Sequence, residues 1–431
     1  MQKLIKGKIL HFARATATPE NDYTFIADGA LLVESGKIAA IGTAPELQQQ
    51  FPNALQVDYS EHYILPGFID SHIHMPQTEM IASYGEQLLD WLNKYTFPTE
   101  RQFENAEYAD RISRFFLKQL WQNGTTSAMA YATVHPTSVN ALFNAASEHD
   151  MAIWTGKVCM DRHSPEWLQD TAQTAYSESA ELIEKWHHQG RNRYVITPRF
   201  APTSTPEQLA AIGKLQKEYP DTYLQTHLSE NTDEVEWVKS LFPEAKNYLD
   251  VYDQYGLVHD RAFFGHCIYL DDDSWQTLAD RKAKVSFCPR SNTFLGSGLY
   301  PLHKAKQYGV VSTLATDVAG GDSFNMLRTL GEAYKVCQLQ GETLDAMSGL
   351  YMMTMGSAIA LGADKEIGNL SPQSAADFVV LDPHFSDLSQ LRITDTNAPE
   401  DVIFALSMLA DERTTVATWI AGNPVFEQEK R

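Results

Sequence analysis

The sequence predicts a TIM-type (β/α)8 barrel with a small β-domain that is built from both chain ends. A β-rich segment opens the chain, eight apolar runs alternate with amphipathic helices from residue 67 onward, and β-like runs return after about residue 370. We expect residues 1–66 and 371–431 to form the β-domain and residues 67–370 to form the barrel. A chain of 431 residues with 43% hydrophobic content can bury both parts.

The β-domain is predicted from short β-like runs at each end of the chain. Residues 29–42 contain short strand-like runs that are separated by turn residues. Strand-like runs occur again at 376–382 and 415–422. The simplest arrangement joins these runs in one domain beside the barrel.

The barrel is predicted from eight apolar runs of strand length. Helical patterns lie between them at 103–122, 166–187 and 206–218, where apolar residues recur at helical spacing. Eight such units close a TIM-type barrel. The expected strands are 67–72, 125–131, 152–159, 194–199, 222–227, 262–266, 284–288 and 310–316.

Composition limits the partners and the location. A formal net charge of −21 argues against nucleic acid and against an anionic membrane, because both would repel this surface. No run approaches the roughly 20 apolar residues of a membrane span, and the first residues lack the apolar core of a signal peptide. We therefore expect a cytoplasmic protein.

A disulfide framework is not expected from the four cysteines, which lie in apolar runs: Cys159, Cys267, Cys288 and Cys337.

Five residues at the ends of predicted strands indicate a metal site. His72 and His74 end the first strand and leave the same face, because strand side chains alternate. Any single one of the 14 histidines is more simply a surface or core residue. His227, His266 and Asp317 end three further strands, however, and barrels gather their strand ends at one face. Imidazole and carboxylate ligands suit zinc, and they would also accept iron or another divalent ion.

These runs resemble the amidohydrolase superfamily. The resemblance is carried by PGFIDSHIH at 66–74, THLSE at 226–230, GHC at 265–267 and ATD at 315–317, and it covers nearly the whole chain. Within the superfamily, MPQTEM at 75–80, YGEQLLDWL at 84–92, FPTE at 97–100 and TPRFAPT at 197–203 are similar to the guanine deaminase family.

The resemblance implies that one metal ion is held by four residues, namely His72, His74, His227 and Asp317. Relatives with two metals usually carry a carboxylated lysine on strand four, and 194–200 contains no lysine. A single Zn²⁺ is therefore favoured, with Fe²⁺ as an alternative. His266 is then expected to hydrogen-bond the activated water, although a role as a ligand stays open.

Glu230, three residues after His227, is the group we expect to transfer protons. Most glutamates in an acidic protein are simply solvated. Metal coordination lowers the pKa of water, but a leaving amine still needs a proton from a nearby acid. We expect Glu230 to relay that proton while Asp317 and His266 orient the nucleophile.

The resemblance also maps purine recognition onto Gln77, Arg199 and Phe200. Arginine has only donors, so Arg199 would accept the C6 carbonyl of guanine and reject the amino group of adenine. Gln77 offers a donor and an acceptor, and Phe200 offers an apolar face. Each has a structural alternative: Gln77 could cap a turn, Arg199 could pair with a carboxylate, and Phe200 could pack in the barrel.

The connection from residue 76 to about 101 is long for a barrel loop. We expect residues 88–92 to form a pocket wall or lid, with Trp91 and Leu92 near the substrate. The alternative is contact with a second subunit in a homodimer, and both roles are compatible.

The resulting hypothesis is hydrolytic deamination of the small molecule guanine to xanthine and ammonia by a metal-activated water. A deaminase of another ring, such as an oxidised purine, a pterin or a triazine, would use the same metal site. A non-catalytic scaffold is the alternative from another class, and the intact ligand set with Glu230 argues against it. The sequence leaves open the metal, the oligomeric state and the tolerance for substituted guanines.

Overall fold

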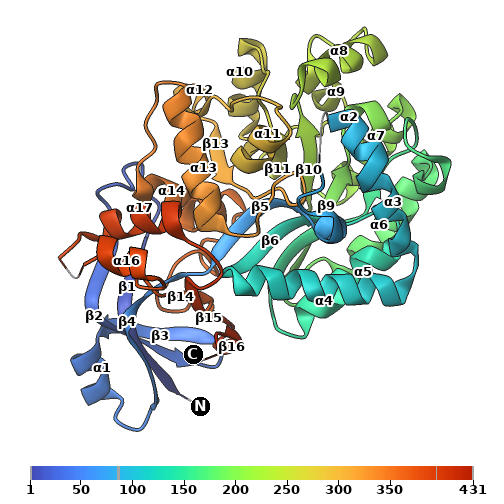
Figure 1. The fold of residues 1–431 in the computed structure, drawn as a ribbon. Helices are drawn as coiled ribbons and strands as arrows, with labels where there is room; N and C mark the ends of the chain where they lie inside the picture. The colour runs from blue at the N-terminus through green and yellow to red at the C-terminus, as the bar shows by residue number, and fades with distance from the viewer. Residues whose placement is uncertain (1, 85–87, 395, 430–431) are drawn as a thin grey trace.

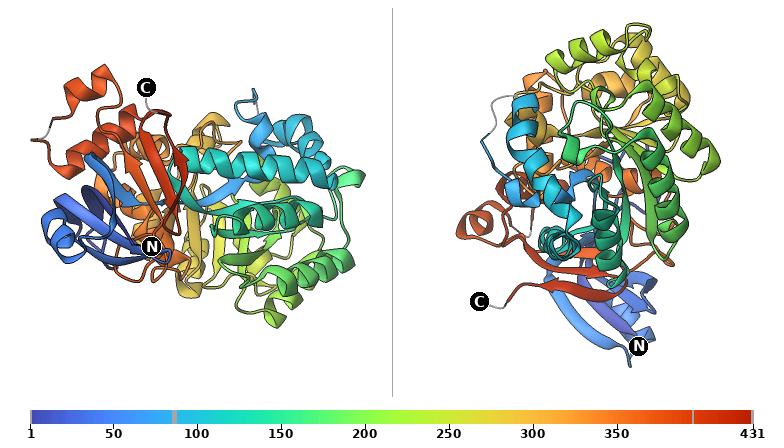
Figure 2. Two further views of the ribbon diagram at one scale, coloured as in Figure 1. Left: turned by 90° about the horizontal axis from the view of Figure 1, so that it is seen from below. Right: turned by 90° about the vertical axis from the view of Figure 1, so that its right-hand side faces the viewer.

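The computed structural model describes residues 2–84, 88–394 and 396–429, which form a barrel with a smaller sheet beside it (Figure 1). The smaller sheet has seven strands in the order β16-β15-β14-β4-β1-β2-β3. Both chain ends lie in this part of the molecule (Figure 2). Its strands are β1 (Lys3–His11), β2 (Thr24–Glu34), β3 (Lys37–Thr43), β4 (Leu55–Pro66), β14 (Phe378–Leu381), β15 (Thr415–Ile420) and β16 (Asn423–Glu427).

The two ends of the chain meet where β4 pairs with β14. These strands are antiparallel, with Pro66 opposite Phe378, while the other edge of β4 pairs in parallel with β1. Apolar side chains from both ends, including Ile5, Ile64 and Trp419, share one buried cluster. The predicted β-domain from both chain ends is thus confirmed, whereas its exact limits at residues 66 and 371 stay a prediction.

Eight predicted barrel strands are present, and the third is divided into two short strands. Parallel pairing runs from β5 to β13, and β7 and β8 both pair with β9. The sheet forms a nearly closed barrel, so the predicted fold class is confirmed. The strands are β5 (Phe68–His74), β6 (Thr125–Tyr131), β7 (Ala152–Gly156), β8 (Val158–Cys159), β9 (Asn192–Pro198), β10 (Tyr223–Leu228), β11 (Ala262–His266), β12 (Lys284–Phe287) and β13 (Val311–Leu314).

Helices cover the outside of the barrel and start at defined caps. The side chain of Asn105 accepts a hydrogen bond from the Tyr108 N–H at the start of α4, and Thr205 caps α7 in the same way. The barrel-side helices are α4 (Ala106–Gln122), α5 (Pro136–Ser147), α6 (Ala172–Trp186), α7 (Pro206–Glu218), α8 (Thr232–Leu241), α9 (Tyr248–Asp253), α10 (Asp272–Arg281), α11 (Pro289–Phe294), α12 (Leu302–Tyr308), α13 (Met326–Leu339), α14 (Ala346–Met352) and α15 (Met355–Ala360). None of the described helices is long and apolar enough to cross a membrane.

Three helices in the terminal segments were not predicted from the sequence. Helix α1 (Ala44–Gln50) follows β3, and α16 (Asp387–Arg392) and α17 (Pro399–Leu409) separate β14 from β15. Helix α17 packs against α13 and α14, and its Ile403 and Leu406 are buried there. The C-terminal segment therefore contributes helices as well as strands.

The long connection after β5 has structure of its own, as predicted. It contains the 3₁₀ helix η1 (Met75–Met80), helix α2 (Leu88–Trp91), a π-helical turn η2 (Leu92–Thr96), helix α3 (Phe97–Arg101) and the 3₁₀ helix η3 (Gln102–Glu104). Trp91, Phe97 and Phe103 are buried in the main core, which fixes this segment against the barrel. The expected lid at 88–92 falls in α2 and the start of η2, whereas residues 85–87 of the resemblance motif at 84–92 lie outside the described residues.

Candidate active site

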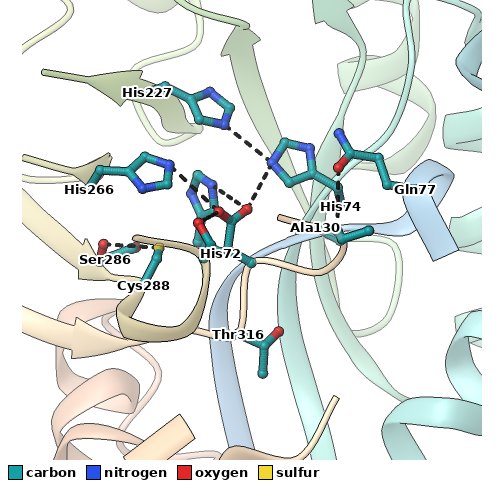
Figure 3. A network of polar contacts seen from close by, with 12 residues as sticks. His72, His74, Gln77, Ala130, His227, His266, Ser286, Cys288 and Thr316 are labelled. Atoms are coloured by element: carbon teal, nitrogen blue, oxygen red, sulfur yellow. Dashed lines mark hydrogen bonds and ion pairs between the residues drawn. The ribbon is translucent and has the colours of Figure 1, made fainter. Parts of the chain in front are cut away.

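The predicted ligand residues lie at the ends of three strands and converge on one point, where Figure 3 shows the three histidines close together. His72 and His74 end β5, His227 lies in β10, and Asp317 follows β13. The Nε2 atoms of His72 and His74 lie 3.4 and 3.2 Å from Asp317 Oδ1, and the Nε2 atoms of His74 and His227 are 3.2 Å apart. His266, at the end of β11, lies beside them, with Nε2 3.7 Å from Asp317 Oδ2. The sequence-based grouping of these residues agrees with the geometry.

The backbone brings the first and last barrel strands together at this point. The Asp317 N–H donates to the His72 carbonyl at 2.9 Å, and the His74 N–H donates to the Val318 carbonyl at 2.8 Å. Asp317 and His266 have positive φ angles of 51° and 70°, which non-glycine residues rarely adopt. Such conformations are costly and cluster at functional sites.

Glycine at position 265 makes room for one of the imidazoles. A Cβ atom there would lie 2.6 Å from His72 Cε1, well inside van der Waals contact. His72 can therefore occupy the barrel interior only because its neighbour on β11 has no side chain.

Burial keeps three of the imidazoles neutral. It lowers the pKa of His72, lowers the pKa of His74 to about 4, and, with the neighbouring imidazoles, lowers the pKa of His227 well below its usual value. Burial alone would raise the pKa of Asp317, but contacts with His72 and His74 hold it well below the usual range. The cluster thus offers neutral nitrogens and an ionised carboxylate.

This donor set fits a divalent metal ion. His227 Nδ1 donates to the Arg199 carbonyl at 2.7 Å, so its Nε2 carries a lone pair that faces His74. His72 Nε2 is buried and has no hydrogen-bond partner among the described residues. The candidate ligand atoms of His72, His74 and His227 all lie within 4.8 Å of one another. The imidazole lone pairs therefore converge with no proton between them, and a bound cation would stabilise this arrangement.

Cys288 also lies near the cluster, but its chemistry does not suit a ligand. Its thiol donates to the Ser286 carbonyl at 3.3 Å, as Figure 3 shows. Burial and the charge of Asp317 raise the pKa of this thiol well above its usual value. A protonated thiol is a poor metal ligand, since the thiolate is the binding form.

Two residues that the sequence analysis did not single out orient His266 and Asp317. Ser291 Oγ donates to Asp317 Oδ2 at 2.5 Å, and His266 Nδ1 donates to Asn292 Oδ1 at 2.8 Å. Both belong to α11, directly after strand β12. Their position after a barrel strand was the available signal, because such positions face the same end of the barrel.

Glu230 is buried and lies next to His266. Its Oε2 is 3.4 Å from His266 Nε2, and its Oε1 accepts a hydrogen bond from Ser297 Oγ at 2.9 Å. Burial raises the pKa of Glu230 to about 7. A carboxyl group with this pKa can both accept and give a proton near neutral pH.

The N-terminus of α8 holds Glu230 in place. Glu234 forms a capping box with Asn231, and the same carboxylate accepts from the Glu230 N–H at 2.9 Å and the Asn231 N–H at 3.1 Å. Glu234 was missed in the sequence, although the Asn-x-x-Glu pattern that begins four residues after His227 signals this cap.

The predicted substrate-contacting residues line one pocket above the cluster. Gln77, Trp91, Leu92, Arg199 and Phe200 share its wall. The pocket also contains members of the polar cluster, namely His74, His227, Glu230, His266 and Asp317. The sequence therefore predicted residues that the fold brings to one cavity.

The structure bears differently on the structural roles that the sequence left open for Gln77, Arg199 and Phe200. Gln77 Oε1 accepts from the Ala319 N–H at 3.3 Å, and no hydrogen bond from its side chain to the following turn occurs among the described residues. Arg199 does pair with a carboxylate, because its Nη1 lies 2.8 Å from both oxygens of Glu100. The Phe200 ring contacts Trp237 with ring centres 6.3 Å apart while it lines the pocket.

Comparisons with known proteins agree with this architecture. The amidohydrolase family pattern matches residues 63–425, and that of a bacterial imidazolonepropionase-like composite domain matches residues 29–54. The chain is 49% identical to guanine deaminase of Escherichia coli (strain K12), covering 99% of this chain and 98% of that protein.

Solved structures extend the similarity to the fold. A structure of E. coli guanine deaminase superposes with a TM-score of 0.97 at 48% identity, covering 99% of this chain and 100% of that chain. A structure of guanine deaminase from C. acetobutylicum, which has guanine bound in its active site, gives a TM-score of 0.90 at 28% identity, covering 99% and 100% of the two chains.

Proposed function

Since the chain belongs to the guanine deaminase family of the amidohydrolases, we propose that it hydrolyses guanine to xanthine and ammonia. One observation of the site carries this proposal. The buried Glu230 and the donors of Gln77 and Arg199 share a single pocket with four members of the cluster, namely His74, His227, His266 and Asp317. A pocket that combines a metal-type cluster with donors for a planar base suits hydrolysis of that base.

We propose that His72, His74, His227 and Asp317 hold one divalent ion, Zn²⁺ in the first place and Fe²⁺ as the alternative. A divalent ion in such a site lowers the pKa of water toward 7 and supplies a nucleophile at neutral pH. His266 stands apart from these four in role, because its Nε2 faces the Glu230 carboxylate at 3.4 Å. It is suited to hold the attacking water by a hydrogen bond.

Glu230 carries out the proton transfers in this proposal. It takes a proton from the attacking water and delivers it to a ring nitrogen of guanine as the water oxygen bonds to C2, which becomes tetrahedral. Glu230 then passes the second proton of that oxygen to the amino group, the C2–N bond breaks, and ammonia leaves as C2 becomes the carbonyl of xanthine. Its pKa of about 7, caused by burial, suits both directions of transfer. Asp317, ionised and hydrogen-bonded by Ser291, stabilises positive charge that develops beside it.

Recognition of the base is assigned to the pocket wall. Arg199 donates to the C6 carbonyl of guanine, which adenine lacks, and Gln77 serves the ring nitrogen and amino edge. Phe200 supports the face of the ring, while Trp91 and Leu92 exclude water from the reaction. Trp91 and Leu92 are 3% and 8% exposed, as a closed pocket wall requires.

The proposal is tested by measuring metal content together with ammonia release from guanine, adenine, cytosine and a triazine. We expect about one metal ion per chain and release from guanine alone. Release from another ring in place of guanine would assign the site to a different deaminase. A metal-free protein that is inert toward the whole panel would indicate a scaffold.

A homodimer and a cytoplasmic location are further proposals. The apolar side chains of Tyr84, on the connection after β5, and Phe115, on α4, are 72% and 51% exposed, which suits contact with a second subunit. Light scattering of the purified protein tests the dimer, and cell fractionation tests the location. A monomer at micromolar concentration would contradict the first proposal.

A further inference from the structure

A buried ion pair joins Arg199 of the pocket wall to Glu100, a residue with no role in the proposed function. Arg199 and Glu100 are 3% and 0% exposed, and Arg199 Nη1 donates to both carboxylate oxygens at 2.8 Å. An unpaired charge at this depth would be strongly unfavourable, so Glu100 allows Arg199 to remain in the wall. Glu100 belongs to α3, on the connection that follows β5, whereas Arg199 follows β9.

The same carboxylate also reaches Gln77. Gln77 Nε2 lies 3.4 Å from Glu100 Oε1, and Gln77 Oε1 accepts from the Ala319 N–H at 3.3 Å. Donor and acceptor ends of the amide are therefore both fixed, which leaves one orientation for this side chain. One carboxylate thus contacts both polar side chains of the pocket wall.

The pairing also determines which arginine donors remain for a ligand. Nη1 is occupied by Glu100, while Nη2 and Nε make no hydrogen bond among the described residues. The guanidinium is planar and rigid, so fixing Nη1 also fixes the direction of the other donors. The Phe97 ring, 5.6 Å from the guanidinium carbon, restricts it further.

We propose that Glu100 is a positioning residue that directs Arg199 toward the carbonyl edge of the base and Gln77 toward its ring-nitrogen and amino edge, and this inference rests on the proposed function. Glu100 does not need to touch the substrate. Without its charge, Arg199 would lose the partner that sets its direction, and the pocket would lose its preference for a ring with an oxygen at C6.

The test compares two purines that differ at this edge. Hypoxanthine carries the C6 carbonyl and unsubstituted purine lacks it, and calorimetric titration gives the Kd of each without requiring turnover. We expect Glu100→Gln to reduce the wild-type preference for hypoxanthine by about 10-fold or more, as for loss of a charged hydrogen bond. Glu104→Gln, an exposed change in η3 of the same segment, should leave the preference intact.

A second variant and a combined variant keep the test decisive. Glu100→Asp retains the charge but shortens the side chain, so its preference should lie between those of wild type and Glu100→Gln. If Glu100 acts through Arg199, Glu100→Gln should reduce the preference no further in an Arg199→Met background. A wild-type preference in either folded Glu100 variant, or equal weakening of both purines, would overturn the inference.

Ammonia release from guanine by the wild-type protein, measured in parallel, separates this inference from the proposed function. Active wild-type protein with an unchanged preference in Glu100→Gln contradicts the positioning role alone. Wild-type protein that neither releases ammonia nor prefers hypoxanthine contradicts both.

Discussion

Replacing Glu230 with glutamine removes the proposed proton carrier with little change of shape. The Ser297 hydroxyl can still donate to the remaining oxygen at the position of Oε1, now 2.9 Å away. Glu230 is not among the clustered ligand atoms of the candidate metal site, so the metal content should be unchanged. General acid–base catalysis contributes roughly 10²- to 10⁴-fold, and we expect kcat to fall by about that factor.

The pH profile gives a second measure of the same residue. Because burial raises the pKa of Glu230 to about 7, the ionised form that accepts a proton is lost as the pH falls below that value. The kcat/KM of the wild type should therefore decrease by about tenfold per pH unit on the acid side. This acid limb should be absent in Glu230→Gln, since the amide does not titrate.

The assay is ammonia release from guanine, with metal content measured on the same samples. Glu236→Gln on α8 is the matched control, because the Glu236 side chain is 74% exposed and only six positions further along the chain. Glu230→Gln with full metal content and activity within about threefold of wild type would refute the assigned role. Loss of metal in this variant would instead show that Glu230 supports the ligands.

Three further predictions concern base recognition, the metal and stability. Arg199→Ala should raise KM for guanine or lower kcat while metal remains bound, and unchanged kinetics would show that the base is held elsewhere. Removal of metal with a chelator should abolish ammonia release and lower Tm, because an ion that binds only the folded chain stabilises it; added Zn²⁺ or Fe²⁺ should restore both. Burial lowers the pKa of His11 to about 4. Between about pH 6.5 and 4 this imidazole is therefore protonated in the unfolded chain but neutral in the folded chain. The free energy of unfolding should decrease as the pH falls through this range. From pH 7 to 5 the His11 contribution is about 2 kcal/mol. Urea unfolding should show that His11→Asn, which keeps an acceptor for the Leu370 N–H, has a correspondingly weaker pH dependence; an identical dependence would contradict the assignment.

The barrel strands and the ligand cluster were predictable because both depend on short-range patterns. Strand β6 (Thr125–Tyr131) and strand β11 (Ala262–His266) have the predicted bounds, and both are buried along their whole length. His72, His74 and Asp317 were identified because parallel barrel strands place their ends on one face whatever the loops do.

The residues that were missed act through contacts that no local pattern records. Glu100 looks like any other acidic residue near the end of a short helix, and only the fold brings it within 2.8 Å of Arg199, 99 positions later. Helix α17 was missed because its apolar residues resemble those of the neighbouring strands in the sequence. Its packing against α13 determines that this segment is helical. Tertiary contacts of this kind override local preference.

The hydrogen bonds between His72 and Asp317 and between His74 and Val318 have a consequence for biosynthesis. The first ligands leave the ribosome long before the last one, so a nascent chain holds an incomplete set of donors until translation has passed residue 317. Metal capture should therefore be one of the last events in maturation, and truncated products should compete poorly for the ion. Cells starved of the metal would then accumulate full-length chains that await it, and these chains would be the ones most exposed to quality-control proteases.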